Sequence, residues 1–434
     1  MNKEKIVICW FRRDLRLEDQ AALFHALKSG YPVLPLFIFD DNILNKLSSK
    51  NDRRVSLIYR ILEKMHIELR KTGSGIYLKK GNPVEVFRNL IKEFHIQAVY
   101  TTSDYEPYAI SRDTEIEKLL LENQIIFYSL KDQVIFEKND IQKSDNQPYT
   151  VFTPYAAKWK QKISASSINH FPSEEILNNC IKKDGTDFFS IESIGFQSVP
   201  IIYEEPLVNL PIIRQYDKTR DFPGIEGTSK LSLHLRFGTI SIRKLVGIAM
   251  RHNETWLNEL IWREFFMMIL WHFPKVVNHA FKQKYEKIPM RFDESEFNKW
   301  CEGKTGFPIV DAGMRELNET GFMHNRVRMI TANFLTKLML HDWRLGEAYF
   351  SEKLMDYDLS ANNGNWQWSA GCGCDAAPYF RIFNPDEQIR KFDPEKKYIQ
   401  KWITELDSPD YLPMLDYKTC RERALFVYKN GLDS

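Results

Sequence analysis

The chain has 434 residues, of which 43% are hydrophobic, and its formal net charge is +2. This length predicts two or three domains, and the hydrophobic content allows a large core, so a disordered chain is excluded. So small a net charge excludes a protein that binds nucleic acid through its bulk charge, and any basic surface must be local.

The termini and the cysteines point to a compartment. Six cysteines in a chain of this length are not typical of a disulfide scaffold and favour reduced thiols. The first residues, "MNKEKIVICWFRRDLRL", lack the apolar core of a signal peptide, and the longest apolar run, at 265–271, is too short to span a bilayer. We therefore expect a soluble cytoplasmic protein with no membrane partner.

Short β-branched and apolar runs alternate with helix-period segments over residues 1–132. The expected strands lie at 5–11, 31–40, 74–81, 96–104 and 125–132, and the expected helices at 19–30, 53–73, 82–94 and 113–124. This alternation predicts an α/β domain with a five-stranded parallel sheet, Rossmann-like in architecture. The sequence "FRRDLRLED" follows the first strand in place of G-x-G-x-x-G, so we do not assign dinucleotide binding to this half.

The rest of the chain divides into a linker and a helical domain. Residues 133–210 are less periodic and predict a long connection with short helices. From 211 to 434 the strand signals fade and helical periodicity returns, for example at 256–273 and 324–343. We therefore expect an all-α domain over 211–434.

Four stretches of the helical half carry side chains suited to chemistry. In "EGTSKLSLHLRFG", Thr228, Ser229, Lys230 and Ser232 stand at an expected helix start, which suits a phosphate. A simple helix N-cap is the alternative.

In "NELIWREFF", Glu259, Trp262 and Arg263 fall within one helical turn and share a face. A carboxylate, an indole and a guanidinium together can hydrogen-bond a base edge, stack on it and hold a phosphate. An interface tryptophan beside an ordinary ion pair is the alternative.

In "HNRVRMITANF", Asn325 shares a helix face with Arg328 and with Met329. An exposed basic face is the usual explanation of such a pattern. In "LMDYDLSANNGNW", Asp356 and Asp358 stand two apart but lack the ligand density of a calcium loop. A pair between one of these carboxylates and Arg328 is the alternative to a metal.

The sequence "GCGCD" holds Cys372 and Cys374, which could suggest zinc. The spacing is C-x-C, and no C-x-x-C or nearby histidine supplies further ligands. We expect small residues in a close-packed turn and no metal.

Together these stretches resemble the photolyase and cryptochrome flavoproteins, and within them the bacterial class I cyclobutane pyrimidine dimer photolyases. The resemblance covers almost the whole chain, through "WFRRDLRLED", "RDFPGIEGTSKLS", "NELIWREFF", "GKTGFPIVDAGMRELNETGFMHNRVRMI", "DWRLGEAYF" and "DYDLSANNGNWQW". It implies an antenna-type α/β domain over 1–132, a linker, and a helical domain over 211–434 that binds a U-shaped FAD. The active form would be FADH⁻.

The resemblance implies a role for each motif residue around the cofactor. Asn362 would lie by N5 of the isoalloxazine, and Arg328 would pair with Asp356 and place positive charge beside the reduced flavin. Trp366 and then Trp343 would relay electrons to the flavin. The implied FAD contacts are Tyr216, Thr228, Ser229, Lys230, Leu231, Ser232, Trp262, Arg328, Asp356, Tyr357, Asp358 and Asn362.

The resemblance also implies a DNA substrate, single- or double-stranded and damaged by ultraviolet light. Light would drive an electron from FADH⁻ to a flipped-out dimer, which splits and returns it. The implied contacts to the lesion and to DNA are Arg220, Glu259, Trp262, Arg263, Asn325, Arg326, Met329, Trp368, Arg381 and Lys391, of which Glu259, Asn325 and Met329, with Asn362, would be catalytic. We expect a monomer with no obligate protein partner.

Three departures from the family pattern matter. Phe322 stands at the position taken as the usual third tryptophan of the relay, which predicts slow or rerouted photoreduction of oxidised flavin. Asn325 and Met329 stand where relatives that repair (6-4) photoproducts have histidines, which favours cyclobutane dimers. Tyr108 and Ala109 replace the Asn-Glu pair of folate-binding relatives, so a folate, a deazaflavin, another flavin and no antenna all stay open.

Two other classes of protein compete with this interpretation. A cryptochrome would bind FAD and signal through a protein partner, but the chain has no long extension after "YKNGLDS" and carries the lesion-facing residues. A flavin-dependent redox enzyme acting on small molecules lacks support because no nicotinamide fingerprint is present.

Overall fold

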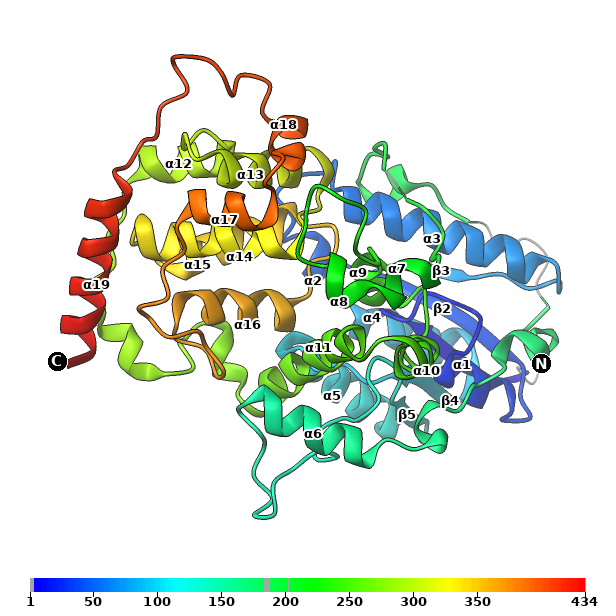
Figure 1. Cartoon of the computed structure of the whole chain (residues 1–434). Coiled ribbons are helices and arrows are strands. Elements are labelled where there is room, and N and C mark those ends of the chain that lie inside the picture. The colour runs from blue at the N-terminus through cyan, green and yellow to red at the C-terminus, as the bar shows by residue number, and fades with distance from the viewer. Residues whose placement is uncertain (1–3, 183–187, 202, 434) are drawn as a thin grey trace. The chain divides into compact units, whose positions relative to one another are not determined.

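The computed structural model describes residues 4–182, 188–201 and 203–433 (Figure 1). The chain forms two compact units, and each is assembled from three segments. Unit 1 comprises Met1–Glu137, Ile163–Leu207 and Leu231–Ile248, and unit 2 comprises Lys138–Lys162, Val208–Lys230 and Ala249–Ser434. The predicted linker, 133–210, therefore contributes to both units.

Unit 1 contains the predicted five-stranded parallel sheet. Its strands are β1 (Lys5–Phe11), β2 (Val33–Asp40), β3 (Tyr77–Gly81), β4 (His95–Thr102) and β5 (Ile126–Leu130), in the order β3-β2-β1-β4-β5. Central β1 pairs in parallel with β2 and with β4. Both β1 and β2 are buried almost along their whole length, and this burial is why they read as continuous apolar runs instead of alternating ones.

Helices cover this sheet. They include α1 (Ala21–Leu27), α2 (Asp41–Leu44), α3 (Arg53–Arg70), α4 (Pro83–Glu93) and α5 (Pro107–Glu122). Helix α4 shows why the chain turns where it does: Asn82 caps it by accepting from the Val84 and Glu85 amides, and Pro83 occupies the first helical position. Its buried face joins the core formed with β1, β2 and β4.

A buried ionic network holds the segment 231–248 in unit 1. This segment includes α9 (Ser232–Phe237) and the start of α10 (Ile242–His252). Arg243 Nη2 lies 3.0 Å from Asp19 and 2.9 Å from Asp132, and Arg16 Nη2 lies 2.7 Å from Asp132. Burial alone would raise the pKa of Asp132, but the two guanidiniums outweigh it and hold that pKa below its usual range.

Unit 2 is helical, as predicted. Its helices are α6 (Phe152–Lys162), α7 (Leu210–Arg214), α8 (Tyr216–Thr219), α11 (Glu254–His272), α12 (Glu294–Glu302), α13 (Pro308–Thr320), α14 (Asn325–Asn333), α15 (Trp343–Lys353), α16 (Leu359–Ala370), α17 (Pro385–Phe392), α18 (Lys397–Trp402) and α19 (Tyr417–Asp433). A large apolar cluster in their core includes residues of α13, α14, α15 and α16.

The helix expected over 324–343 is interrupted. Helix α14 ends at Asn333, a π-helical turn follows over Phe334–Leu338, and Leu340 adopts a left-handed backbone with φ of 59°. Inside that turn, buried Lys337 donates from Nζ to the carbonyl of Ala370 at 2.6 Å. The interruption therefore lets a buried lysine cap the last turn of α16.

No helix in the described part of the chain has both the length and the apolar character needed to cross a membrane. All six cysteines are free thiols. Among residues 4–182, 188–201 and 203–433, no group of three or more His, Cys, Asp or Glu side chains is placed to hold a metal ion.

Candidate active site

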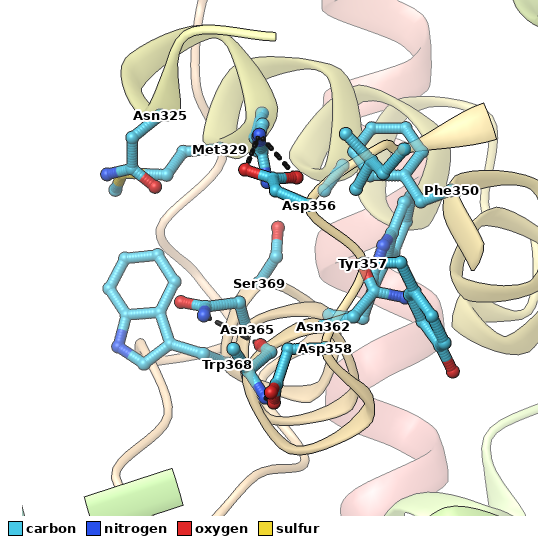
Figure 2. Close-up of a pocket in the computed structure, with 15 residues that line it drawn as sticks. Asn325, Met329, Phe350, Asp356, Tyr357, Asp358, Asn362, Asn365, Trp368 and Ser369 are labelled. Carbon is cyan, nitrogen blue, oxygen red and sulfur yellow. Dashed lines mark hydrogen bonds and ion pairs between the residues drawn. The ribbon is translucent and has the colours of Figure 1, made fainter. Parts of the chain in front are cut away.

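A pocket of about 590 Å³, part of it open to solvent, lies among α14, α15, α16 and the loop before α16 (Figure 2). Both apolar and polar side chains line it. They are Asn325, Arg328, Met329, Ala332, Phe350, Leu354, Asp356, Tyr357, Asp358, Ala361, Asn362, Asn365, Trp366, Trp368 and Ser369. Segments that are separate in the sequence, 325–329 and 356–368, thus meet at one cavity.

The face of α14 predicted from residue spacing is the face that lines the pocket. Asn325, Arg328 and Met329 are three and four residues apart, so they stand on adjacent turns. Asn325 Nδ2 lies 3.9 Å from the sulfur of Met329. The helix begins at Asn325, and His324 caps it by accepting at Nδ1 from the Arg326 amide at 3.2 Å.

An ion pair crosses one end of the pocket, as Figure 2 shows. Arg328 Nη2 lies 2.9 Å from Asp356 Oδ2, which is the predicted pair, and Arg328 Nε donates to the Met323 carbonyl at 2.7 Å. The Asp356 side chain is only 5% exposed, whereas that of Arg328 is 25% exposed. The pair therefore places a fixed positive group at the wall of the cavity.

Two polar groups of α16 complete the pocket wall. Asp358 caps the helix, accepting from the Ala361 amide at 3.2 Å and from the Ser360 hydroxyl at 2.5 Å. Asn362 donates from Nδ2 to the carboxyl of Glu347 at 2.8 Å. Burial raises the pKa of the Glu347 carboxyl, and hydrogen bonds from Asn362 and Tyr357 oppose that rise.

Trp366 forms part of the apolar wall. Its ring meets Phe350 edge-on at a centroid distance of 5.0 Å and Trp300 at 6.2 Å. Trp300 is fully buried and donates from Nε1 to the Thr331 carbonyl at 3.2 Å. These aromatic neighbours were not singled out in the sequence, because their rings converge from three different helices.

The other two relay positions have different surroundings. Trp343 is buried at the start of α15, where the Arg344 guanidinium lies 4.8 Å from its ring centroid. Phe322 lies under Arg328, with the guanidinium 5.7 Å from its ring centroid. The order Trp366, Trp343, Phe322 stays a prediction.

A second group of predicted residues gathers around α11. Glu259 forms an ion pair with Arg220, and its side chain is about one-third exposed, at 32%. Burial raises the pKa of Glu259, and Arg220 opposes this. Asp221, the next residue in the chain, accepts from Arg326 Nη2 at 2.6 Å. The loop residues 220 and 221 thereby link Glu259 to the first turn of α14.

Trp262 is half-buried, and Phe152, which was not predicted from the sequence, covers one face of its ring. Phe152 of α6 lies parallel to the indole at a centroid distance of 3.7 Å and an angle of 5°. Phe266 stacks on Trp262 at 5.4 Å. The aromatic-rich stretch "PYTVFTPY" was a usable signal for Phe152, although nothing in it named the partner.

The predicted phosphate contacts lie in two different units. In unit 2, the Thr219 hydroxyl of α8 donates to the Gly227 carbonyl at 2.9 Å, which brings Tyr216 and the stretch 228–230 into one local structure. Ser229 accepts from Trp256 Nε1 at 3.4 Å, and Lys230 pairs with Glu226 at 2.5 Å.

In unit 1, Leu231 is buried and Ser232 is exposed. Helix α9 begins at Ser232 with Leu231 at the N-cap and no side-chain cap. The simple N-cap explanation for these hydroxyls is therefore wrong.

Three predicted DNA contacts stand apart from the pocket lining. Arg381 and Lys391 are exposed, and Arg263 is half-buried. The Arg326 guanidinium and the Lys391 ammonium lie 4.3 Å and 5.1 Å from the ring centroid of Phe392, so two cations flank one buried ring. Of these two cations, Lys391 is exposed, whereas Arg326 is paired with Asp221.

The pocket fits the isoalloxazine of a flavin by its donor set. A flat ring needs apolar walls and a few convergent polar groups, here Phe350 and Trp366 beside Asn362. The Arg328 guanidinium, held by Asp356, adds a cationic donor at the cavity wall that suits an anionic reduced ring. A parallel α/β unit together with a helical unit that carries such a pocket defines the photolyase class of flavoproteins.

Comparison with known proteins bears this out. Residues 7–175 match the family described as DNA photolyase, and residues 256–425 match the FAD binding domain of DNA photolyase. The chain is 35% identical to deoxyribodipyrimidine photo-lyase of Alkalihalophilus pseudofirmus, over 100% of this chain and 94% of that protein. It is also 35% identical to deoxyribodipyrimidine photo-lyase of Escherichia coli, over 97% and 98% of the two chains.

Solved structures give the same answer. A bacterial class III photolyase from Agrobacterium tumefaciens superposes with a TM-score of 0.88 at 30% identity, over 100% of this chain and 99% of that one. An archaeal photolyase from Sulfolobus tokodaii, solved with two FAD molecules, has a TM-score of 0.79 at 33% identity, over 98% and 99%. The chain belongs to the photolyase and cryptochrome family. It is an enzyme of the lyase class, and FAD is its cofactor.

Proposed function

We propose that this enzyme repairs cyclobutane pyrimidine dimers in ultraviolet-damaged DNA under light. The observation that carries the proposal is the composition of the pocket. Asn325 and Met329 of α14 and Trp368 of α16 line the same cavity as the Arg328–Asp356 pair and Asn362. A base-sized stacking surface and amide groups for a base edge are thus combined with the flavin-facing groups.

In this proposal FAD, when bound and reduced, supplies a light-excited electron to the dimer and takes it back after the ring has split. Arg328 keeps positive charge at the cavity wall, which favours an anionic reduced cofactor. Asn362 of α16 and Asp358, which caps this helix, would hold the polar edge of the cofactor. Trp368 offers a face for stacking, and Asn325 offers donors and an acceptor for the base edges.

Glu259 and Trp262 would contact the dimer from α11. Glu259 forms an ion pair with Arg220 in the structure, so an acceptor carboxyl and a cationic donor would meet the dimer together. The raised pKa of Glu259 makes its carboxyl easier to protonate, and a protonated carboxyl can donate to a thymine carbonyl. A dimer that stacks and pairs poorly costs less to flip out than a normal base step.

Cations would hold the phosphates. Lys391 and Arg381 are exposed, and half-buried Arg326 flanks Phe392 together with Lys391. Phosphate contacts give affinity without sequence preference, as repair of any dimer site requires. We propose a cytoplasmic monomer that meets its DNA without a protein partner.

The test uses chemically reduced enzyme and an oligonucleotide with one thymine dimer, assayed for recovered thymine under near-ultraviolet light and in the dark. We expect light-dependent recovery that is lost in Glu259→Ala and kept in the matched control Glu254→Gln. Glu254 is an exposed acid at the start of the same helix, paired with Lys160 at 2.6 Å. No recovery from enzyme with FAD bound and fully reduced would refute repair and favour a photoreceptor.

A further inference from the structure

The hydroxyl of Ser369 is buried and has no hydrogen-bond partner among the described residues. Ser369 belongs to the last turn of α16, lines the pocket and is 3% exposed. Leaving a buried hydroxyl unpaired costs free energy, so native structures pair such groups with protein atoms, ordered water or a bound ligand. An unpaired donor in the wall of a cavity therefore points to the molecule that fills the cavity.

The usual local partner of a helical hydroxyl is not used by Ser369. Serine and threonine in a helix often donate to the carbonyl four residues earlier, as Thr336 does to Ala332 at 2.8 Å. The corresponding carbonyl for Ser369 is that of Asn365, and no hydrogen bond joins the two. Figure 2 shows instead that the Ser369 oxygen points away from the ribbon of α16 and into the cavity.

The position of Ser369 along α16 indicates which bound molecule its hydroxyl meets. It follows Trp368 directly, and Asn325 and Met329 line the same cavity from α14. Asn362 stands seven residues earlier, which is roughly 10 Å along a helix. With N5 of the flavin at Asn362, the nearer flavin carbonyl lies beside N5 and away from Ser369. A carbonyl of the lesion is therefore the acceptor that fits.

We propose that Ser369 is a further lesion-binding residue, whose hydroxyl donates a hydrogen bond to a carbonyl oxygen of the flipped-out dimer. The inference rests on the repair function proposed above. Each base of a thymine dimer keeps two carbonyl groups, at C2 and C4, and a serine hydroxyl supplies one donor. Trp368 offers a face for stacking, and Ser369 offers a donor to an edge of the same lesion.

Binding in the dark measures this contact apart from repair. Holoenzyme with FAD bound is titrated with an oligonucleotide that holds one thymine dimer and with the undamaged oligonucleotide. Loss of one hydrogen bond predicts that Ser369→Ala weakens binding of the dimer about three- to tenfold and leaves binding of undamaged DNA unchanged. The matched control is Ser351→Ala, which removes a hydroxyl that donates to the Ala348 carbonyl at 2.7 Å and should change neither affinity.

Trp368→Ala separates failure of this inference from failure of the repair function. If Trp368→Ala weakens binding of the dimer and Ser369→Ala does not, the pocket binds the lesion and the role of Ser369 is wrong. If the wild type binds damaged and undamaged DNA equally, the repair function is wrong and the inference falls with it.

The thermal stability of the holoenzyme distinguishes a ligand contact from a structural one. Removing an unpaired buried hydroxyl should leave the Tm of Ser369→Ala unchanged or raise it. A lower Tm together with equal weakening of both DNAs would assign the hydroxyl to the fold and overturn the inference.

Infrared spectra of the dark complex identify the acceptor. The dimer carries ¹³C at its C2 or its C4 carbonyls, so that each carbonyl band can be assigned. Loss of a hydrogen bond raises the frequency of a carbonyl band, and we expect one dimer band to rise in Ser369→Ala. If a carbonyl band of bound FAD rises and no dimer band does, the hydroxyl serves the cofactor and the inference is wrong.

Discussion

His324 makes the first turn of α14 sensitive to acid. Its Nδ1 accepts a hydrogen bond from the Arg326 amide at 3.2 Å, so the ring must be neutral to cap the helix. Burial, reinforced by the positive charge of Arg328 and opposed by Asp221, lowers the pKa of His324 to about 4. Protonation would remove the cap and bring a charge into a site that is 5% exposed.

The sign and size of the effect follow from this pKa. The folded-state pKa is below the value of 6.5 taken for the unfolded chain, so the unfolded state binds the extra proton first as pH falls. The stability is therefore fully present above pH 6.5 and is lost as the pH falls toward 4. Between pH 7.5 and 5.0 the two pKa values predict a loss of about 2 kcal/mol in the free energy of unfolding.

The assay is urea unfolding at pH 7.5 and 5.0 with FAD at one fixed concentration, since ligand binding also shifts stability. His324→Asn keeps a side-chain acceptor at the N-cap but does not titrate, so its acid loss should be about 2 kcal/mol smaller than that of the wild type. His324→Ala lacks the cap as well as the titrating group. Its free energy of unfolding should therefore be about 1 kcal/mol lower than that of His324→Asn at both pH values. An acid loss in His324→Asn equal to that of the wild type would refute the reasoning.

Gly346→Ala would place a Cβ 2.0 Å from Trp366 Cη2, so we expect a loss of roughly 2–3 kcal/mol of stability and a changed tryptophan fluorescence. The control Gly247→Ala meets its nearest atom at 3.5 Å inside a helix and should be neutral or stabilising. Phe152→Ala removes the ring that stacks on the Trp262 indole, so it should weaken binding to dimer-containing DNA about two- to tenfold in a titration. Unchanged affinity would argue against Trp262 as a lesion contact. Lys391→Gln should reduce the slope of log affinity against log salt by about 1, and an unchanged slope would remove Lys391 from the phosphate contacts.

Local geometry explains what could be predicted from the sequence. The parallel sheet followed from buried apolar runs that alternate with helix-period segments, because both periods are properties of a single segment. The shared face of Asn325, Arg328 and Met329 followed from helical spacing in the same way. The pair between Arg328 and Asp356 could not be predicted from spacing alone. Nothing in the local sequence distinguishes a carboxylate that binds an arginine from one that binds a metal.

The interruption of the helix expected over 324–343 could not be predicted, because its apolar periodicity continues through the π-helical turn. Within that turn, Lys337 makes a tertiary contact by donating from Nζ to the carbonyl of Ala370. A lysine in a helical segment is expected to extend its ammonium group to solvent, yet Lys337 is buried. Its partner is a carbonyl thirty-three residues away along the chain, which no local pattern reveals.

The same limit applies to the chemistry of the pocket. Residue spacing can bring Asn362 to a site, but an amide presents a donor or an acceptor according to which partner holds its other end. In this enzyme that partner is Glu347, which lies on a different helix. None of the sequence motifs that predicted the site singled it out. The identity of a pocket residue therefore follows from the sequence, whereas the hydrogen-bonding group that it presents follows only from the residue behind it.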